Sequence, residues 1–335
     1  MAKPYLRGQN LHRVRILPAV AIAALIIGAG LAHATTGTSL DAPNWSIGDF
    51  WEYAFNTTFE DTVSLDGRVR ADVTALRNAS VVRVGQDVFV VDAVGSGLLE
   101  GVFPSPLGDL PADGTWNLTG EQFITTRSRK IVQSLLDIRA SGDAQVPLLG
   151  NRPFTFRWLN ATTNRVELDE WTYPVAVGTL ADIVLNSSWS DDVSITLTGF
   201  PPLTFNNTAI ATHSLTLTLL RTDTLSVPAG NFDVFVIEER WPDNRREQSY
   251  YAPSVGNNAK TIEYNASGGE VSRTELLRYR YQASETGLDP IVIGAIVGGA
   301  ILATMAAIIV ARRWMRRRRA REERYTPPSL REPPT

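Results

Sequence analysis

The sequence predicts a mainly β ectodomain with antiparallel strands, followed by one C-terminal transmembrane helix. Three observations support this prediction: segments of period-two alternation, an uncharged apolar run near the C-terminus, and charge sorted by position. The net charge of −3 combines +4 in residues 1–34, −13 in 35–311 and +6 in 312–335. An acidic middle between basic ends that border apolar runs is typical of a membrane-anchored protein.

The N-terminal segment has the features of a secretory signal peptide. An uncharged run from Ile16 to Ala32 follows a basic region and precedes Ala32-His33-Ala34. A basic region, an apolar stretch and a small-x-small site predict a signal peptide over 1–34, cleaved before Thr35. The alternative is an uncleaved N-terminal anchor, because this apolar run is longer than usual. Both interpretations place the N-terminus inside.

The C-terminal apolar run predicts a single membrane span over 290–311. Ile291–Ala311 is 21 residues without a charge, about 31 Å as a helix. Six arginines follow between positions 312 and 319, which indicates a cytoplasmic basic tail over 312–335 that touches membrane lipids. The Pro-rich end predicts a disordered tail, and no nucleic-acid partner is expected. Gly294 and Gly298 have the spacing of a helix-packing face, so a homodimer through this helix is one hypothesis.

Between these segments, residues 35–289 are expected to form one extracellular β domain. Ala211–Leu219 alternates between threonine or serine and leucine, and 193–198 alternates in the same way; such order predicts strands with one solvated face. Phe232–Ile237 is apolar on both faces, as in a covered strand. A turn is expected at 265–269 and loops between 99 and 120. The spacing of apolar residues over 127–139 predicts a short amphipathic helix.

Glycosylation motifs are frequent in this domain. Eight of the fifteen asparagines between 35 and 289 begin N-x-S/T, which predicts surface glycans; chance occurrence in a Thr-rich domain is the alternative. The candidate acceptors are Asn44, Asn56, Asn78, Asn117, Asn160, Asn186, Asn206 and Asn265. Many such motifs in a chain without cysteine favour an archaeal cell-surface glycoprotein over a eukaryotic secreted domain.

The composition excludes most catalytic chemistry. With no cysteine there are no disulfides, thiolate nucleophiles or Cys-ligated metals, and only three histidines occur. His213 alone lies in the ectodomain, without a G-x-S-x-G nucleophile motif. Neighbouring carboxylates such as Glu238-Glu239, Asp191-Asp192 and Asp169-Glu170 point to opposite faces of a strand, so none forms an acid/base pair by itself. We therefore expect no catalytic, cofactor or metal residues, and we expect most of the seven ectodomain tryptophans to fill a core.

Two sequence elements resemble those of TapB-like secreted proteins, a group that includes lipoprotein-carrier-like domains. Leu225-Ser-Val-Pro-Ala-Gly-Asn-Phe and Tyr250-Tyr-Ala-Pro-Ser-Val-Gly256 match their turn and strand signatures. The residues that carry the resemblance are Pro228, Gly230, Phe232, Tyr251, Pro253 and Gly256. The resemblance covers mainly 170–282 and implies an antiparallel sheet curled into a half-barrel over an apolar cavity. The chain departs from the family pattern in its predicted C-terminal anchor and at Asn257-Asn258-Ala259.

Three functions follow as hypotheses. The first is a single-pass surface protein, ectodomain outside and C-terminus cytoplasmic, whose non-enzymatic β domain acts in envelope structure or binds an envelope protein. The second is binding of a lipid or other apolar ligand by the half-barrel. The third, which the sequence favours least, is a carboxylate-dependent hydrolase acting through residues such as Glu238 and Glu239.

Overall fold

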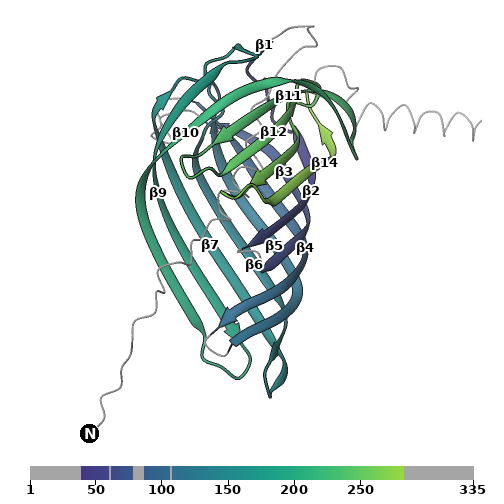
Figure 1. Cartoon of the computed structure of the whole chain (residues 1–335), viewed down its shortest axis with the longest axis vertical. Helices are drawn as coiled ribbons and strands as arrows, with labels where there is room; N and C mark the ends of the chain where they lie inside the picture. The colour runs from purple at the N-terminus through teal and green to yellow at the C-terminus, as the bar shows by residue number, and fades with distance from the viewer. Residues whose placement is uncertain (1–38, 60–61, 78–86, 106–107, 283–335) are drawn as a thin grey trace, which may run out of the picture. The chain divides into compact units, whose positions relative to one another are not determined.

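A computed structural model describes residues 39–59, 62–77, 87–105 and 108–282. These residues form a closed barrel of twelve antiparallel strands and a separate two-stranded sheet (Figure 1). The barrel strands are β2 (Phe50–Phe59), β3 (Val63–Arg77), β4 (Val88–Ser105), β5 (Gly108–Thr125), β6 (Ile131–Val146), β7 (Gly150–Asp169), β9 (Leu180–Leu197), β10 (Leu203–Val227), β11 (Gly230–Arg240), β12 (Arg246–Ala252), β13 (Asn257–Tyr264) and β14 (Glu270–Arg280). The small sheet pairs β1 (Ser39–Leu40) with β8 (Val175–Ala176), and a 3-10 turn covers Pro253–Val255.

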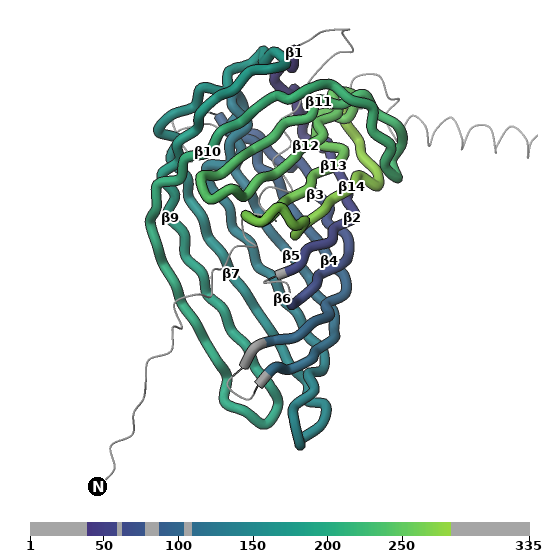
Figure 2. The backbone as a smooth tube through the Cα atoms, in the orientation of Figure 1, coloured from purple at the N-terminus to yellow at the C-terminus, as the bar shows by residue number. Residues whose placement is uncertain are grey.

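The strands follow chain order around the wall, and β14 pairs with β2 to close it (Figure 2). Following paired residues once around the wall from Leu203 leads to Leu219 on the same strand, a displacement of 16 residues. In an ideal barrel of twelve strands this displacement gives a tilt of about 43° and a backbone radius of about 12 Å. Such a barrel is wider than the eight-stranded barrels whose interiors side chains just fill.

The mainly β prediction is confirmed, but the half-barrel is a correction: the sheet closes. The closing strands are β11 to β14, which continue the curl and bring Ser272–Arg280 into register with Phe50–Thr57. Closure satisfies the backbone groups that an open sheet would leave along these edges. The turn expected at 265–269 does join β13 to β14.

Alternation places apolar side chains inside the barrel and polar ones outside. On β2, Trp51, Tyr53 and Phe55 are buried in the main core cluster. On β10, Leu215 and Leu217 are buried in a second cluster, while the intervening Thr216 bonds Asp182 on the exposed side. The strand expected at 193–198 lies in β9 up to Leu197, and the strand expected at 211–219 is part of β10.

The helix expected over 127–139 is wrong, because Ile131–Val146 is strand β6. A register shift between Phe123 and Ile124 of β5 faces this segment. The shift allows Ile131 to join the inner cluster while Val132 packs in an outer one. The resulting apolar spacing imitates a helix, but pairing with strands on both sides decides the structure. The loops expected between 99 and 120 are likewise mostly strand, in β4 and β5.

Glycines let the wall of β3 and β4 approach Trp116 of β5. Gly67 pairs directly with Gly97, and a Cβ added at Gly97 would lie 1.9 Å from the backbone oxygen of Asp66. The Trp116 ring occupies the space above these glycines, and its Nε1 donates to the Asp66 carbonyl at 3.2 Å. Glycine inside a strand is therefore required here by close approach of backbone and ring.

The residues of the resemblance lie in two turns. Pro228 and Gly230 form the β10–β11 turn, and Phe232 is buried beyond it. Gly256 ends the 3-10 turn at φ +66°, where a Cβ would lie 2.2 Å from the Tyr281 ring. The carbonyls of Val255 and Gly256 accept hydrogen bonds from Trp51 and Trp45, each at 2.7 Å. These residues therefore fix turns and core, as their chemistry predicts.

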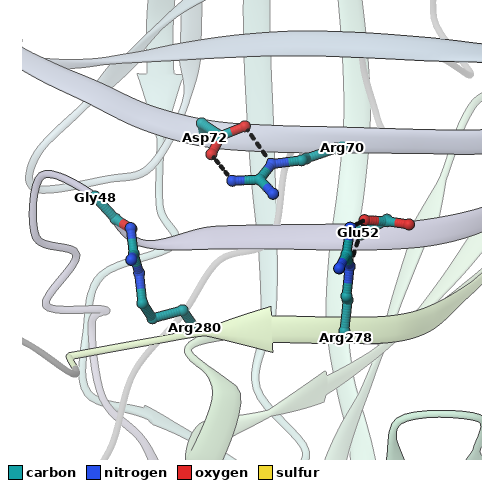
Figure 3. A network of polar contacts seen from close by, with 6 residues as sticks. All are labelled: Gly48, Glu52, Arg70, Asp72, Arg278 and Arg280. Atoms are coloured by element: carbon teal, nitrogen blue, oxygen red, sulfur yellow. Dashed lines mark hydrogen bonds and ion pairs between the residues drawn. The ribbon is translucent and has the colours of Figure 1, made fainter. Parts of the chain in front are cut away.

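Ion pairs on the outer face connect the first and last barrel strands (Figure 3). Arg278 of β14 donates to Glu52 of β2 at 2.6 Å, and Arg280 donates to the Gly48 carbonyl. Arg70 pairs with Asp72 on β3 and lies 3.9 Å from the centre of the Phe50 ring. Although Glu52 is buried, Arg278 is largely exposed, and pairs with one exposed partner contribute about 1 kcal/mol each after solvent screening.

The segments predicted to be a signal peptide and a membrane helix, together with Asn78, Gly294 and Gly298, lie outside the described residues. Within the ranges that the structure describes, no helix is long and apolar enough to cross a membrane.

Candidate functional site: the barrel interior

The interior contains a core built around tryptophans. Side chains of Trp45, Trp51, Trp116 and Trp158 are buried in the main cluster, and Trp171 is buried in the second. The ring centres of Trp45 and Trp51 lie 5.2 Å apart. The core role expected for the tryptophans is confirmed for these five, whereas Trp189 and Trp241 are only partly buried.

Three glutamates form a row across neighbouring strands of the inner face. Glu239 of β11 pairs with Glu247 of β12, which pairs with Glu263 of β13. Glu239 also pairs with the buried Leu217, so the row shares the inner face of the wall. Glu247 accepts a hydrogen bond from the Ser249 hydroxyl at 3.0 Å. Three carboxyl groups therefore lie within reach of one another on a largely apolar surface.

Burial changes the protonation of this row. It raises the pKa of Glu239 and of Glu263 to about 7, and it raises the pKa of Glu247 well above its ordinary value, with repulsion from its two neighbours adding to the effect. Lys130 lies on the β5–β6 turn. Burial lowers its pKa, and the negative charges of Asp169 and Glu239 partly oppose this shift. At neutral pH the row thus includes protonated carboxyl groups, which donate as well as accept hydrogen bonds.

Neighbouring carboxylates do point to opposite faces, as the strand geometry predicts. Glu238 lies on the outer face and pairs with Arg240 at 2.6 Å, while Glu239 faces the interior. Asp191 is buried and accepts hydrogen bonds from Trp158 and Asn160, at 2.9 and 2.8 Å.

The row of glutamates was not predicted, because it depends on the register of two hairpins. Its signal in the sequence is the equal distance of Glu239 and Glu247 from the turn residue 243.

On one side the barrel wall extends less far along the barrel axis, because its strands are short. β11, β12, β13 and β14 have 11, 7, 8 and 11 residues, whereas β10 has 25. β10 pairs with β11 only from Thr216 onward, although it pairs with β9 from Leu203. No described strand pairs with the other edge of β10 over Leu203–Leu215. Beyond the closed part, the curved sheet of β4, β5, β6, β7, β9 and β10 (Figure 1) therefore ends at the β10 edge, and we call its concave inner face the trough.

The wall of this trough is apolar and partly solvent-exposed. Phe103, Phe156, Val193 and Leu197 pack against the main core while remaining partly exposed. On β10, whose odd-numbered residues continue the same inner face, Phe205 is 49% exposed. Apolar side chains on a concave surface with one polar region match the lining of small-molecule sites.

Polar groups without partners lie on the inner face above this wall. Gln122 is fully buried and pairs across the strands with Ser134. Neither the amide of Gln122 nor the hydroxyl of Ser134 has a hydrogen-bond partner among the described residues. A buried amide without partners costs free energy unless water or a ligand reaches it.

Other features of the molecule do not form a site. A hollow of about 380 Å³ lies at the tips of the β4–β5 and β6–β7 hairpins and is lined by Pro111, Val146 and Leu148. It contains no cluster of titratable groups. His213 stacks near Trp189, with ring centres 5.9 Å apart, and burial lowers its pKa. No group of three potential metal ligands occurs within the part of the chain that the structure describes.

The glycosylation candidates differ in accessibility. Asn44, Asn56, Asn117, Asn186 and Asn206 are exposed. Asn265 is partly buried, and its Oδ1 caps the β13–β14 turn by accepting from the Gly269 amide at 2.8 Å. Asn160 is buried on the inner face and bonded to Asp191. The exposed acceptors remain predictions, and the folded barrel gives no access to Asn160.

A scan against protein-family models, a search of curated proteins and a search of solved structures each found no match for this chain. The resemblance to TapB-like proteins therefore stays a prediction from the turn motifs.

Proposed function

We propose that the barrel is a non-enzymatic binding module that holds an apolar or amphiphilic ligand in the trough. The observation that carries this proposal is the partly exposed apolar wall, which includes Phe156 and Phe205, beside the unpaired edge of β10. A ligand that covers these exposed aromatic side chains removes apolar surface from water. This favours binding by about 25 cal/mol per Å² buried. The interior beyond the trough supplies hydrogen-bonding groups for a polar head.

The row of glutamates Glu239, Glu247 and Glu263 narrows the class of ligand. Carboxyl groups with pKa values near 7 on Glu239 and Glu263 would accept a neutral, hydrogen-bonding head more readily than an anionic one. An anionic head would add repulsion to a row that is already partly ionised. The proposed ligand is thus an uncharged or cationic amphiphile, and its chain would contact the wall that includes Phe103 and Val193.

The sequence supports a location for this activity outside the membrane. The apolar run Ile291–Ala311 and the arginines that follow predict an anchor, and the barrel would then be displayed on the cell surface. The alternative function, a role in envelope structure or protein interaction, is supported by the edge of β10 over Leu203–Leu215, which no described strand covers.

A fluorescent apolar probe tests the proposed site. Phe156→Asn removes an aromatic group from the inner wall of β7, and Leu159→Asn removes a partly exposed leucine from the outer side of the same strand. We expect the first variant to bind the probe at least about tenfold more weakly than the parent. The second variant should bind like the parent. Equal binding by both variants would contradict the proposal. So would a native mass spectrum of the purified parent that shows no bound apolar molecule.

A further inference from the structure

The free edge of β10 has features that edges of monomeric sheets avoid. Over Leu203–Leu215 its backbone has no described partner on the side away from β9. The segment contains no Asp, Glu, Lys, Arg or Pro. Its ladder with β9 runs from Leu203 to Thr218 without a register shift. Charges, prolines and bulges are the usual protection against edge pairing, and none of them occurs in this segment.

Side chains along the edge are exposed on both faces. On the outer face, Ile210 is 77% exposed, and Thr204 and Ser214 are exposed beside it. On the inner face, Leu203 and Phe205 are 44% and 49% exposed. A regular edge with uncovered apolar groups on both faces offers backbone hydrogen bonds and apolar burial to a strand that adds to it.

We propose that this edge pairs antiparallel with the same edge of a second copy of the chain, about a two-fold axis at Ala209. This register is the one that uses the whole edge, because it places Leu203 opposite Leu215 of the partner subunit. It places Phe205 opposite His213 of the partner subunit on the inner face and Thr204 opposite Ser214 of the partner subunit on the outer face.

The edge is complementary to itself under this symmetry. Leucine faces leucine and Phe205 faces an imidazole on the inner side, uncharged polar groups or Ile210 and threonine face each other on the outer side, and no like charges meet, since the segment has none. At the axis Ala209 faces its own copy, and two methyl groups fit side by side on the same face of the sheet. An isologous contact of this type closes after two copies and does not propagate into a fibre. The pairing would also join the two troughs along one shared wall.

Because the chain has no cysteine, a single introduced cysteine reports the contact directly. Ala209→Cys in the full-length protein, reconstituted in lipid vesicles, is expected to form a disulfide-linked dimer on mild oxidation. Thr115→Cys, at an exposed outer position of β5, is the matched control and should stay monomeric. Mixed Asn207→Cys and Ala211→Cys chains should also cross-link, because these positions face each other in the proposed register.

A charge-swap pair tests the register and keeps the Asn206-Asn207-Thr208 acceptor motif intact. In the Ala209→Cys background, Thr204→Lys with Ser214→Lys places two like-charge pairs across the contact, and we expect about tenfold less cross-linking. Thr204→Lys with Ser214→Glu replaces them with opposite charges and should restore it. Equal cross-linking in both variants, a signal no greater than that of the Thr115→Cys control, or linkage of Ala209→Cys to a different polypeptide would overturn the proposal. Probe binding is measured separately, so failure of self-pairing leaves the ligand site standing.

Discussion

Replacing Glu263 with glutamine is expected to stabilise the protein at alkaline pH. Glu263 is 9% exposed, lies in the row with Glu247, and has a pKa raised by burial from its ordinary value of 4.5 to about 7. The folded protein therefore holds this proton more tightly than the unfolded chain. Stability is fully present below about pH 4.5 and falls as the pH rises through about 7, because folding must then keep a buried charge or take up a proton.

The size of the effect follows from the pKa difference. A rise from 4.5 to about 7 corresponds to about 3 kcal/mol, at about 1.4 kcal/mol per pH unit. Glutamine keeps the shape of the side chain and carries no charge, so Glu263→Gln should gain about 2–3 kcal/mol at pH 8 and nothing at pH 4.5. The unfolding free energy is measured by urea titration of tryptophan fluorescence at both pH values.

Glu238→Gln is the matched control. Glu238 is on the outer face of β11, two strands away, where it pairs with Arg240 and Arg246. Its substitution removes favourable pairs and should leave stability unchanged or slightly lower at pH 8. The reasoning about the interior row is refuted if Glu263→Gln is less stable than the parent at pH 8, or if its gain is the same at both pH values.

Three further outcomes follow from the structure. Gly97→Ala should lose at least about 3 kcal/mol in urea unfolding, because its Cβ would meet backbone at 1.9 Å and strands cannot move apart locally; a neutral variant would show that the β3–β4 contact is looser. Asp137→Asn should lose about 1 kcal/mol at pH 7 after allowance for solvent screening, and the loss should vanish as the pH falls from about 4 toward 2, since two arginines lower the pKa of Asp137 to about 2; a difference that persists at pH 2 would contradict this. In glycopeptide mass spectrometry of the protein from its native cells, a glycan is expected at Asn117 and not at Asn160, which is buried; a fully occupied Asn160 would show that modification precedes folding.

Local patterns in the sequence predicted the class of structure and many of its strands. Alternation of threonine and leucine identified the outer and inner faces of β10, because side chains in a strand alternate between faces. The motifs around Gly230 and Gly256 were recognisable as turn signatures, and the structure has φ +137° and +66° at these glycines. The opposite orientation of Glu238 and Glu239 also followed from strand geometry alone. These properties depend on a few neighbouring residues, so a single sequence contains them.

Tertiary structure decided what depends on pairing between distant strands. Closure of the barrel required β14 to meet β2, more than 200 residues apart in the chain, as in the contact between Arg278 and Glu52. The bulge at Val132 made the apolar spacing of this segment resemble a helix, and pairing with β5 and β7 made it strand β6. The glutamate row and the open edge of β10 arise from register and from unequal strand lengths, since a shift of one residue would turn Glu247 to the other face. Composition and local pattern thus determined a β domain with an acidic central segment, while register determined which carboxyl groups share the interior and which edge of β10 has no partner among the described strands.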